Sequence, residues 1–322
     1  MGSGYGKPRA RATASEANTV PAVPAVALVT TDPAVINGED MDVEILSTAL
    51  EDAAIEVATP RWRDEAVDWA VFDLVVMRSP WDYPERLAEF RRWLHDTARV
   101  ARILNPPRLI EWNLDKSYLL DLEARGVRIV GTTICDDVAG VTAAVRAVDA
   151  TEVIVKPNVS AGSRDTGRFR VDDPAAGRLA DLILRQGKRV LVQPCLSSVC
   201  TEGERALVYF AGRFSHALRK GPILALGGGL VGGTYTEEVQ AIPVDAADRA
   251  LADTTMTAVH HAACSLGLSE ADAVPPYARI DVASGGDGPV LLEAELFEPS
   301  YFLPTAPGAE RAFVRAVLER LT

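Results

Sequence analysis

The chain has few of the residues and segments that mark secreted, membrane or zinc-dependent proteins. It contains four histidines and four cysteines in 322 residues, and the cysteines lie far apart or at spacings unlike a zinc or CxxC motif. No apolar run is long enough to span a bilayer, and the first residues lack the apolar stretch of a signal peptide. We therefore expect a cytoplasmic protein with reduced, mostly packed thiols, to which we assign no chemistry.

The chain also has fewer basic than acidic residues. The chain has 33 Lys and Arg against 45 Asp and Glu, a formal net charge of -12. Long-range repulsion then works against nucleic acid and anionic membrane surfaces unless a local basic patch overcomes it, and the sequence shows no such patch, so neither is an expected partner. With 48% hydrophobic and 24% charged residues, the composition is globular, and the length allows two or three small domains.

The chain is predicted to begin with an arm and an α/β domain. Residues 1–25 mix Gly, Pro, Ala, Ser and Arg without periodicity, which indicates a flexible arm or in part an expression remnant. Strands at 26–30, 55–58 and 72–77 then alternate with helices at 41–53 and 84–94. This alternation is typical of a parallel sheet with helices on its faces, and we assign residues 26–112 to this substrate-side domain.

The remainder is predicted to form two further regions of mixed α and β structure. A Pro-broken loop from 104 precedes a helix at about 114–125, and strands follow at 153–156, 189–193 and 205–210. An apolar strand at 277–282, a Gly-rich hairpin at 284–288 and a strand at 290–296 complete the chain. We place the domain limits at 113–195 and 196–322.

Three acids near the end of the chain are the main candidate for chemistry. Glu293 and Glu295 are two residues apart, so on a strand they share one face, and the hairpin brings Asp281 of the preceding strand close to them. Such a cluster is tolerable if a cation neutralises it, and oxygen ligands favour magnesium or manganese. The alternative is an ordinary solvent-facing side of a hairpin.

Two lysines and a small-residue loop indicate an anion site. Lys116 opens a helix, and Lys156 ends an apolar strand, where its charge is costly to desolvate unless it meets an anion such as a polyphosphate. The loop 158–166, NVSAGSRDT, offers backbone donors and hydroxyls that could fold over phosphates. Alone this signal is weak, because such a loop is usually a turn and no Walker P-loop or GxGxxG motif occurs.

Two further segments could contact a nucleotide. The strand VLVQPCL reaches Gln193 and could offer backbone groups to adenine, with Glu202 and Glu204 within reach of a ribose. Arg219 and Lys220 could meet a transferring phosphoryl group. For Gln193, Glu202 and Glu204 taken singly, an interdomain crossover with solvent-facing acids is nearly as good an interpretation.

The polar cluster after the strand at 72–77 is a candidate substrate site. In parallel sheets, ligands collect beyond the carboxyl ends of the strands. Arg78 stands at such an end, where its guanidinium could hold a carboxylate in a fork. The alternative is an N-cap and turn before the helix at 84–94, and Trp81 could equally be a packing residue. The cluster comprises Arg78, Ser79, Trp81, Asp82 and Tyr83.

The order of these motifs resembles the ATP-grasp superfamily, and most closely its glutathione-synthetase-like branch. The resemblance covers nearly all of the chain after the arm and implies an ATP-grasp fold with an N-terminal parallel-sheet domain. It implies that ATP is held by Lys116, Lys156, the lid loop with Ser160, Gly162 and Ser163, the adenine contacts Gln193, Cys195 and Leu196, and the ribose contact Glu204. It further implies metal ligation by Asp281, Glu293 and Glu295, with Arg219, Lys220 and Arg78 in catalytic roles. Glu295, where Asn is usual, and Gln193, where an acid is common, depart from the family.

A narrower likeness concerns the substrate. The phrases RSPWDY, WNLDKSYL, SAGSRDT and EAELFEPSYFL look like those of ligases grouped with the D-cycloserine-forming cyclo-ligase. In that group the carboxylate of O-ureido-D-serine is activated by ATP, and a nitrogen of the same molecule closes the ring. The resemblance implies a small carboxylate substrate between residues 78–83 and the turn with Glu298 and Ser300, and a homodimer or homotetramer.

Three alternatives stay open at the level of sequence. The first is an intermolecular ligase that joins an amino acid to an amine or to another amino acid. The second is a nucleotide-binding module that has lost catalysis, against which the intact acid trio argues. The third is a ligase that adds amino acids to the tail of a partner protein, which would need an open acceptor groove.

Overall fold

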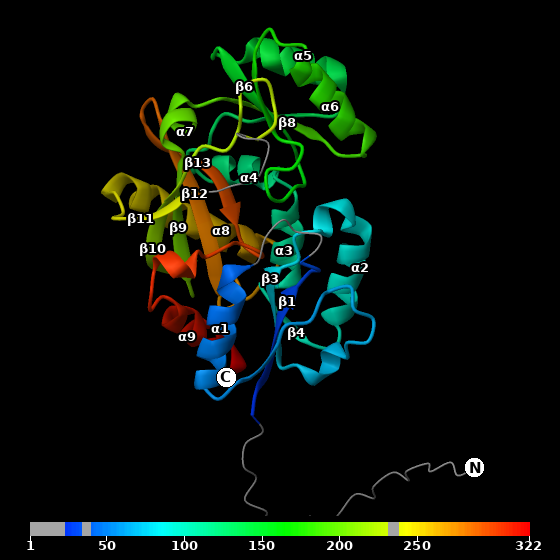
Figure 1. Cartoon of the computed structure of the whole chain (residues 1–322), viewed down its shortest axis with the longest axis vertical. Coiled ribbons are helices and arrows are strands. Elements are labelled where there is room, and N and C mark those ends of the chain that lie inside the picture. Colours follow the sequence, from blue (N-terminus) through cyan, green and yellow to red (C-terminus); the bar gives the residue numbers. More distant parts are fainter. Residues whose placement is uncertain (1–22, 34–39, 231–237) are drawn as a thin grey trace, which may run out of the picture.

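The computed structural model describes residues 23–33, 40–230 and 238–322, so nearly all of the predicted arm and most of the loop 32–40 lie outside the described residues. The described chain is built on three sheets: the one with β6 and β8 lies at one end of the long axis, and the other two lie next to each other and share a core (Figure 1). No helix in this part of the chain is long and apolar enough to cross a membrane.

The first sheet is parallel throughout, as the sequence predicts. Its strands β1 (Ala25–Thr30), β2 (Glu56–Ala58), β3 (Leu74–Ser79) and β4 (Arg102–Leu104) follow the order β2-β1-β3-β4. Alternate residues of β1 and β3 pack against α1 (Met41–Asp52) on one face and α2 (Leu87–Thr97) on the other. Because both faces are covered, the strands carry continuous apolar runs.

The second sheet is antiparallel and has both helices on one face. Strands β5 (Thr133–Cys135), β6 (Glu152–Pro157), β7 (Gly167–Arg170) and β8 (Val190–Pro194) follow the order β5-β8-β6-β7. Helices α5 (Val138–Ala147) and α6 (Ala175–Arg185) pack on it through one apolar cluster. This is the mixed α+β arrangement expected for this half of the chain.

The third sheet is also antiparallel and is covered on both faces. Its strands β9 (Glu204–Phe210), β10 (Arg213–Lys220), β11 (Val239–Ile242), β12 (Tyr277–Gly285) and β13 (Gly288–Glu295) follow the order β11-β10-β9-β12-β13. One face packs on α4 (Tyr118–Ala124) and α8 (Ala246–Ser265). The other meets α9 (Glu310–Leu321) and α1, so the C-terminal helix joins the core of the N-terminal sheet.

Two local features differ from or add to the sequence expectations. The segment expected as a Pro-broken loop contains helix α3 (Pro107–Leu114). Proline is accepted at the first helical position because its missing N–H would have no partner within the helix there. At Gly203, which follows α7 (Ser197–Glu202), φ is +82° and an added Cβ would lie 1.8 Å from the Lys220 carbonyl oxygen. β1 begins at Ala25, one residue before the predicted start of the first domain, and the limits at 112 and 195 stay predictions.

Candidate active site

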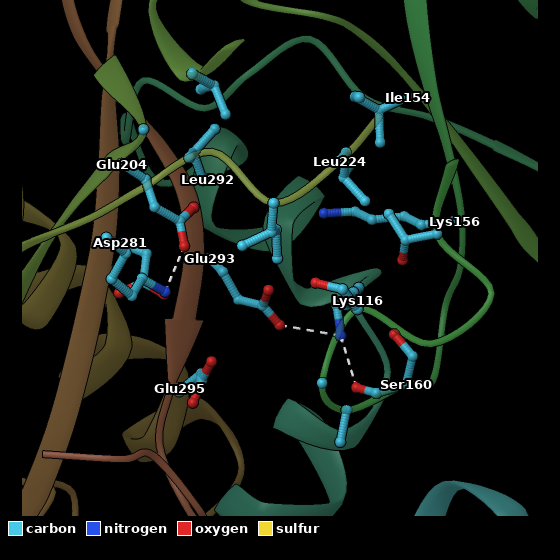
Figure 2. A pocket seen from close by; sticks show the side chains of 18 of the residues that line it. Lys116, Ile154, Lys156, Ser160, Glu204, Leu224, Asp281, Leu292, Glu293 and Glu295 are labelled. Carbon is cyan, nitrogen blue, oxygen red and sulfur yellow. Dashed lines mark hydrogen bonds and ion pairs between the residues drawn. The ribbon is translucent and has the colours of Figure 1, made fainter. Parts of the chain in front are cut away.

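A cavity of about 500 Å³ lies between the second and third sheets, a volume suited to a small organic ligand. Figure 2 shows acids from β12 and β13 on one side and lysines from β6 and the α4 entrance on the other. Seventeen of the predicted site residues line it: Trp81, Tyr83, Lys116, Lys156, Ser160, Gly162, Ser163, Gln193, Cys195, Leu196, Glu204, Lys220, Asp281, Glu293, Glu295, Glu298 and Ser300.

The three predicted metal ligands share one face of the β12–β13 hairpin. Asp281 stands opposite Glu293 in the strand register, and Glu295 stands opposite Arg279. Lys220 Nζ lies 2.9 Å from Asp281 Oδ2 and also pairs with Glu204. Each acid therefore points into the cavity and meets at least one positively charged side chain.

Arg279 is a site residue that the sequence reasoning missed. Its Nε donates to Asp281 Oδ1 at 2.9 Å, and its guanidinium also pairs with Glu295. The available signal was the RID sequence, because on a strand Arg279 and Asp281 face the same side. The acid cluster is thus partly neutralised by the protein itself.

Because the three acids have different charged partners, their pKa values shift in different directions. Burial opposes ionisation of Asp281, but Arg279 and Lys220 outweigh it and lower its pKa to about 2. Burial likewise opposes ionisation of Glu293, yet Lys116 and Lys156 hold its pKa below the ordinary value. Burial raises the pKa of Glu295 well above the ordinary value, against the effect of Arg279.

The two lysines differ in their partners. Lys116 Nζ lies 2.9 Å from Glu293 Oε1 and donates to the Ser160 carbonyl oxygen at 3.1 Å, as the dashed lines in Figure 2 show. Among the described residues, Lys156 has no side-chain hydrogen bond or ion pair, and burial lowers its pKa. Glu293 favours the charged form of Lys156 without a direct ion pair, so the ammonium stays available to an anionic ligand.

The cavity has an apolar wall beside Gln193. Ile154 is the register partner of Gln193 across β6 and β8, and Leu224 and Leu292 also line the cavity. Gln193 is buried and donates from Nε2 to Thr132 Oγ1 at 2.8 Å. A flat, weakly polar ring such as adenine fits between such aliphatic side chains.

The predicted lid loop borders the cavity and touches the N-terminal domain. Residues 160–164 and Thr166 line the cavity, and Arg164 forms an ion pair with Glu85 of the turn after β3. The loop has a tightly turned backbone, with positive φ at Gly162, Ser163 and Asp165. Turns of this kind can direct neighbouring backbone N–H groups toward a bound anion.

Five predicted residues lie outside the cavity lining: Arg78, Ser79, Asp82, Glu202 and Arg219. Arg78 has an exposed fraction of 0%, and its Nε donates to Asp40 Oδ2 at 2.7 Å. Asp82 accepts a hydrogen bond from Trp62, and Arg219 is exposed and donates to Gln240. The strand end is covered by the start of α1, and alternation along β10 turns Arg219 away while Lys220 points inward.

Arg78 instead belongs to a set of donors that fixes the turn bearing Glu298. Trp81 Nε1 donates to the Glu298 carbonyl oxygen at 3.0 Å, and Arg78 donates to the carbonyl oxygen of Pro299. Arg279 donates to the next carbonyl, that of Ser300, at 3.1 Å. We call residues 298–300, with these three donors, the clamped turn.

The following residues are fixed as well. The Asp42 carboxylate accepts backbone hydrogen bonds from Tyr301 at 2.6 Å and Leu303 at 2.8 Å, and Arg78 stacks over the Tyr301 ring. Because Asp42 begins α1, the N-terminal domain sets the position of the cavity wall that carries Glu298. Burial and Glu293 raise the pKa of Glu298 to about 7, although Lys116 and a hydrogen bond with Tyr83 oppose this.

The donor set fits a nucleotide with a hard divalent cation. Carboxylate oxygens are the ligands that Mg²⁺ and Mn²⁺ prefer, and the three acids converge on one face. Lys116 and Lys220 now neutralise these acids, and a polyphosphate would compete for the same lysines. Cations at the acids and phosphates at the lysines would satisfy both sets of charges.

Comparison with solved structures defines the class. The fold is similar to a RimK domain ATP-grasp protein of Sphaerobacter thermophilus, with a TM-score of 0.61 and 16% identity over 91% of this chain and 99% of that one. It is also similar to D-alanine–D-alanine ligase of Bacillus anthracis complexed with ATP, with a TM-score of 0.60 and 12% identity over 92% and 97%. The chain has the ATP-grasp fold.

The family follows from closer relatives. The chain is 36% identical to the cycloserine biosynthesis protein DcsG of Streptomyces lavendulae over 290 residues, 88% of this chain and 94% of that protein. The crystal structure of D-cycloserine synthetase DcsG matches with a TM-score of 0.84 and 35% identity, over 92% of this chain and 100% of that one. The family model described as D-cycloserine synthetase DcsG, N-terminal domain, matches residues 26–105. The chain belongs to the DcsG family and is an ATP-grasp carbon–nitrogen ligase.

Proposed function

We propose that this enzyme closes the ring of D-cycloserine in antibiotic biosynthesis. ATP converts the carboxylate of O-ureido-D-serine into an acyl phosphate with release of ADP, and a nitrogen of the same molecule attacks the activated carbon, loses its proton and expels inorganic phosphate. The observation that carries the reaction class is the convergence of Asp281, Glu293, Lys116 and Lys156 on one cavity. The substrate assignment rests on the 36% identity to DcsG across 94% of that protein.

The nucleotide would occupy the side of the cavity next to the second sheet. Lys116 and Lys156 would hold its phosphates, and Ser160, Gly162 and Ser163 would close over them and exclude water. Gln193 with the backbone of Cys195 and Leu196 would contact adenine, and Glu204 the ribose. Lys220 would stabilise the transferring phosphoryl group. Most of the rate enhancement would then come from positioning and charge.

Asp281, Glu293 and Glu295 would hold magnesium, with manganese as a substitute. The bound metal would supply positive charge that neutralises the phosphoryl oxygens as they react. Arg279, which already bonds to Asp281 and Glu295, would keep these carboxylates on the cavity side of the hairpin.

The substrate would lie against the clamped turn and Tyr83. An amino-acid-like substrate carries N–H donors, and Glu298 in the cavity lining offers a carboxyl group to receive them. Ser300 would add a further polar contact. We also propose a cytoplasmic location and a homo-oligomeric state, dimer or tetramer, on the basis of the family likeness.

An ADP-release assay separates this function from its alternatives. With O-ureido-D-serine as sole substrate, we expect ADP, phosphate and a cyclic product, and added hydroxylamine should trap the acyl phosphate as a hydroxamate. A joining ligase would stay idle until a second amino substrate is added. ATP binding without ADP release across a panel of amino-acid carboxylates would indicate an inactive module and overturn the proposal.

A further inference from the structure

A second group of metal-ligating side chains lies at the C-terminal end of α8, and none of its members lines the cavity. His260 and Cys264 are one turn apart, so they share one side of the helix. Glu270 approaches from the segment that follows the helix. His260 Nε2 lies 3.1 Å from Glu270 Oε2 and 4.0 Å from Cys264 Sγ, and all three ligand atoms lie within 4.8 Å of one another.

This spacing suits a tetrahedral zinc ion. Zinc binds nitrogen and carboxylate oxygen at about 2.0–2.2 Å and thiolate sulfur at about 2.3 Å, so its ligand atoms stand roughly 3.3–3.8 Å apart. The observed 3.1 and 4.0 Å fall on either side of that range, and small side-chain rotations would equalise them. The Glu270 side chain is 86% exposed, which leaves a fourth position open to water.

The ligand types select the metal. Imidazole and thiolate favour zinc over magnesium and calcium, which prefer oxygen. A zinc–sulfur bond forms as the thiol gives up its proton to solvent, so the bound cation meets one thiolate and one carboxylate and its charge is balanced. This zinc ion would lie outside the cavity and would be a different element from the magnesium expected at Asp281.

A rival cluster, of which Cys195 and Cys200 line the cavity, is less suited to zinc. Glu152, Cys195 and Cys200 also lie within 4.8 Å of one another. However, Glu152 already accepts a hydrogen bond from Arg168 at 2.6 Å, and the two sulfur atoms are 2.8 Å apart, closer than two sulfur ligands of one zinc ion. The Arg168 cation would repel a metal at this place.

We propose that His260, Cys264 and Glu270 form a zinc site, completed by water, that ties the end of α8 to the segment leading into β12. Helix α8 packs under the β12–β13 hairpin, so the ion would stabilise the support of the acid cluster without touching substrate. Because zinc binds the folded chain at this site, it should raise the melting temperature in proportion to the logarithm of its concentration.

The test is a cobalt titration of the full-length, chelator-treated enzyme. Cobalt bound to a thiolate gives a near-ultraviolet charge-transfer band that oxygen ligands alone do not give. We expect one equivalent of this band in the wild type, its displacement by zinc, and its loss in Cys264→Ser. His260→Ala should weaken zinc affinity at least tenfold, and Cys200→Ser is the matched control that keeps the band.

Two results would overturn the proposal. One is the absence of a thiolate band in wild-type enzyme whose folding is verified by circular dichroism. The other is a band that survives Cys264→Ser and disappears in Cys200→Ser, which would place the thiolate ligand in the cavity. Cobalt bound at the acid cluster would not confuse either outcome, because that site contributes only oxygen.

Discussion

Replacement of Arg78 by methionine tests whether this residue holds the clamped turn or binds substrate. Methionine keeps much of the side-chain length but removes the guanidinium from a position with no solvent exposure. Asp40, whose side chain is 5% exposed, then loses its ion pair, and the Pro299 carbonyl oxygen loses its donor. Breaking one side of a buried pair costs about 3–5 kcal/mol. Asp42 keeps its backbone donors, so we expect the lower half of that range.

Urea unfolding followed by circular dichroism measures this loss. Stabilities of globular domains lie at about 5–15 kcal/mol, so a decrease of 3–4 kcal/mol leaves a folded but weakened protein. Arg219→Met is the matched control, because Arg219 is exposed, and it should change the unfolding free energy by less than about 0.5 kcal/mol. In the folded fraction, displacement of the turn should raise the KM for the carboxylate substrate more than that for ATP. Wild-type stability with lost activity would contradict this account and restore a direct substrate contact.

Three further predictions concern single residues of the site. Gly203→Ala places a Cβ 1.8 Å from the Lys220 carbonyl oxygen at positive φ, so the unfolding free energy should fall by at least about 1–3 kcal/mol, measured by urea titration. Lys156→Met removes a partly buried ammonium that makes no direct ion pair among the described residues, so calorimetry should show ATP affinity reduced at least tenfold while thermal stability is kept or raised. The pKa of Glu298 is raised to about 7 in the folded protein, so its stabilising contribution is complete below its ordinary pKa and is lost as pH rises through 7. Glu298→Gln should therefore be more stable than wild type at pH 8 but not at pH 4.5; equal stability differences at both pH values would refute this.

Features set by local periodicity were predictable from the sequence. The apolar runs of β1 and β3 indicated a parallel sheet, and the two-residue spacing of Glu293 and Glu295 indicated a shared face. The short hairpin between the two strands also predicted that Asp281 lies close to these acids, and in the structure it stands opposite Glu293.

Features set by contacts between distant elements were not predictable in this way. The burial of Arg78 depends on acids 36 and 38 residues earlier in the chain, at the start of α1. An arginine at the end of a strand looks the same in sequence whether an acid or solvent covers it. The clamped turn likewise requires Trp81 to reach a carbonyl 217 residues away. The role of Arg279 depends likewise on Glu295, which faces it from the neighbouring strand of the hairpin.

The central claim is that the acids of the β12–β13 hairpin hold divalent cations that in turn hold the phosphates of ATP. The most direct measurement is calorimetric ATP binding with and without magnesium, in the wild type and in Glu293→Gln, with turnover measured on the same samples. We expect magnesium to strengthen ATP binding to the wild type, and we expect Glu293→Gln to stay folded while it loses that dependence and all turnover. Near-normal turnover in Glu293→Gln, or wild-type ATP affinity indifferent to magnesium, would contradict the claim.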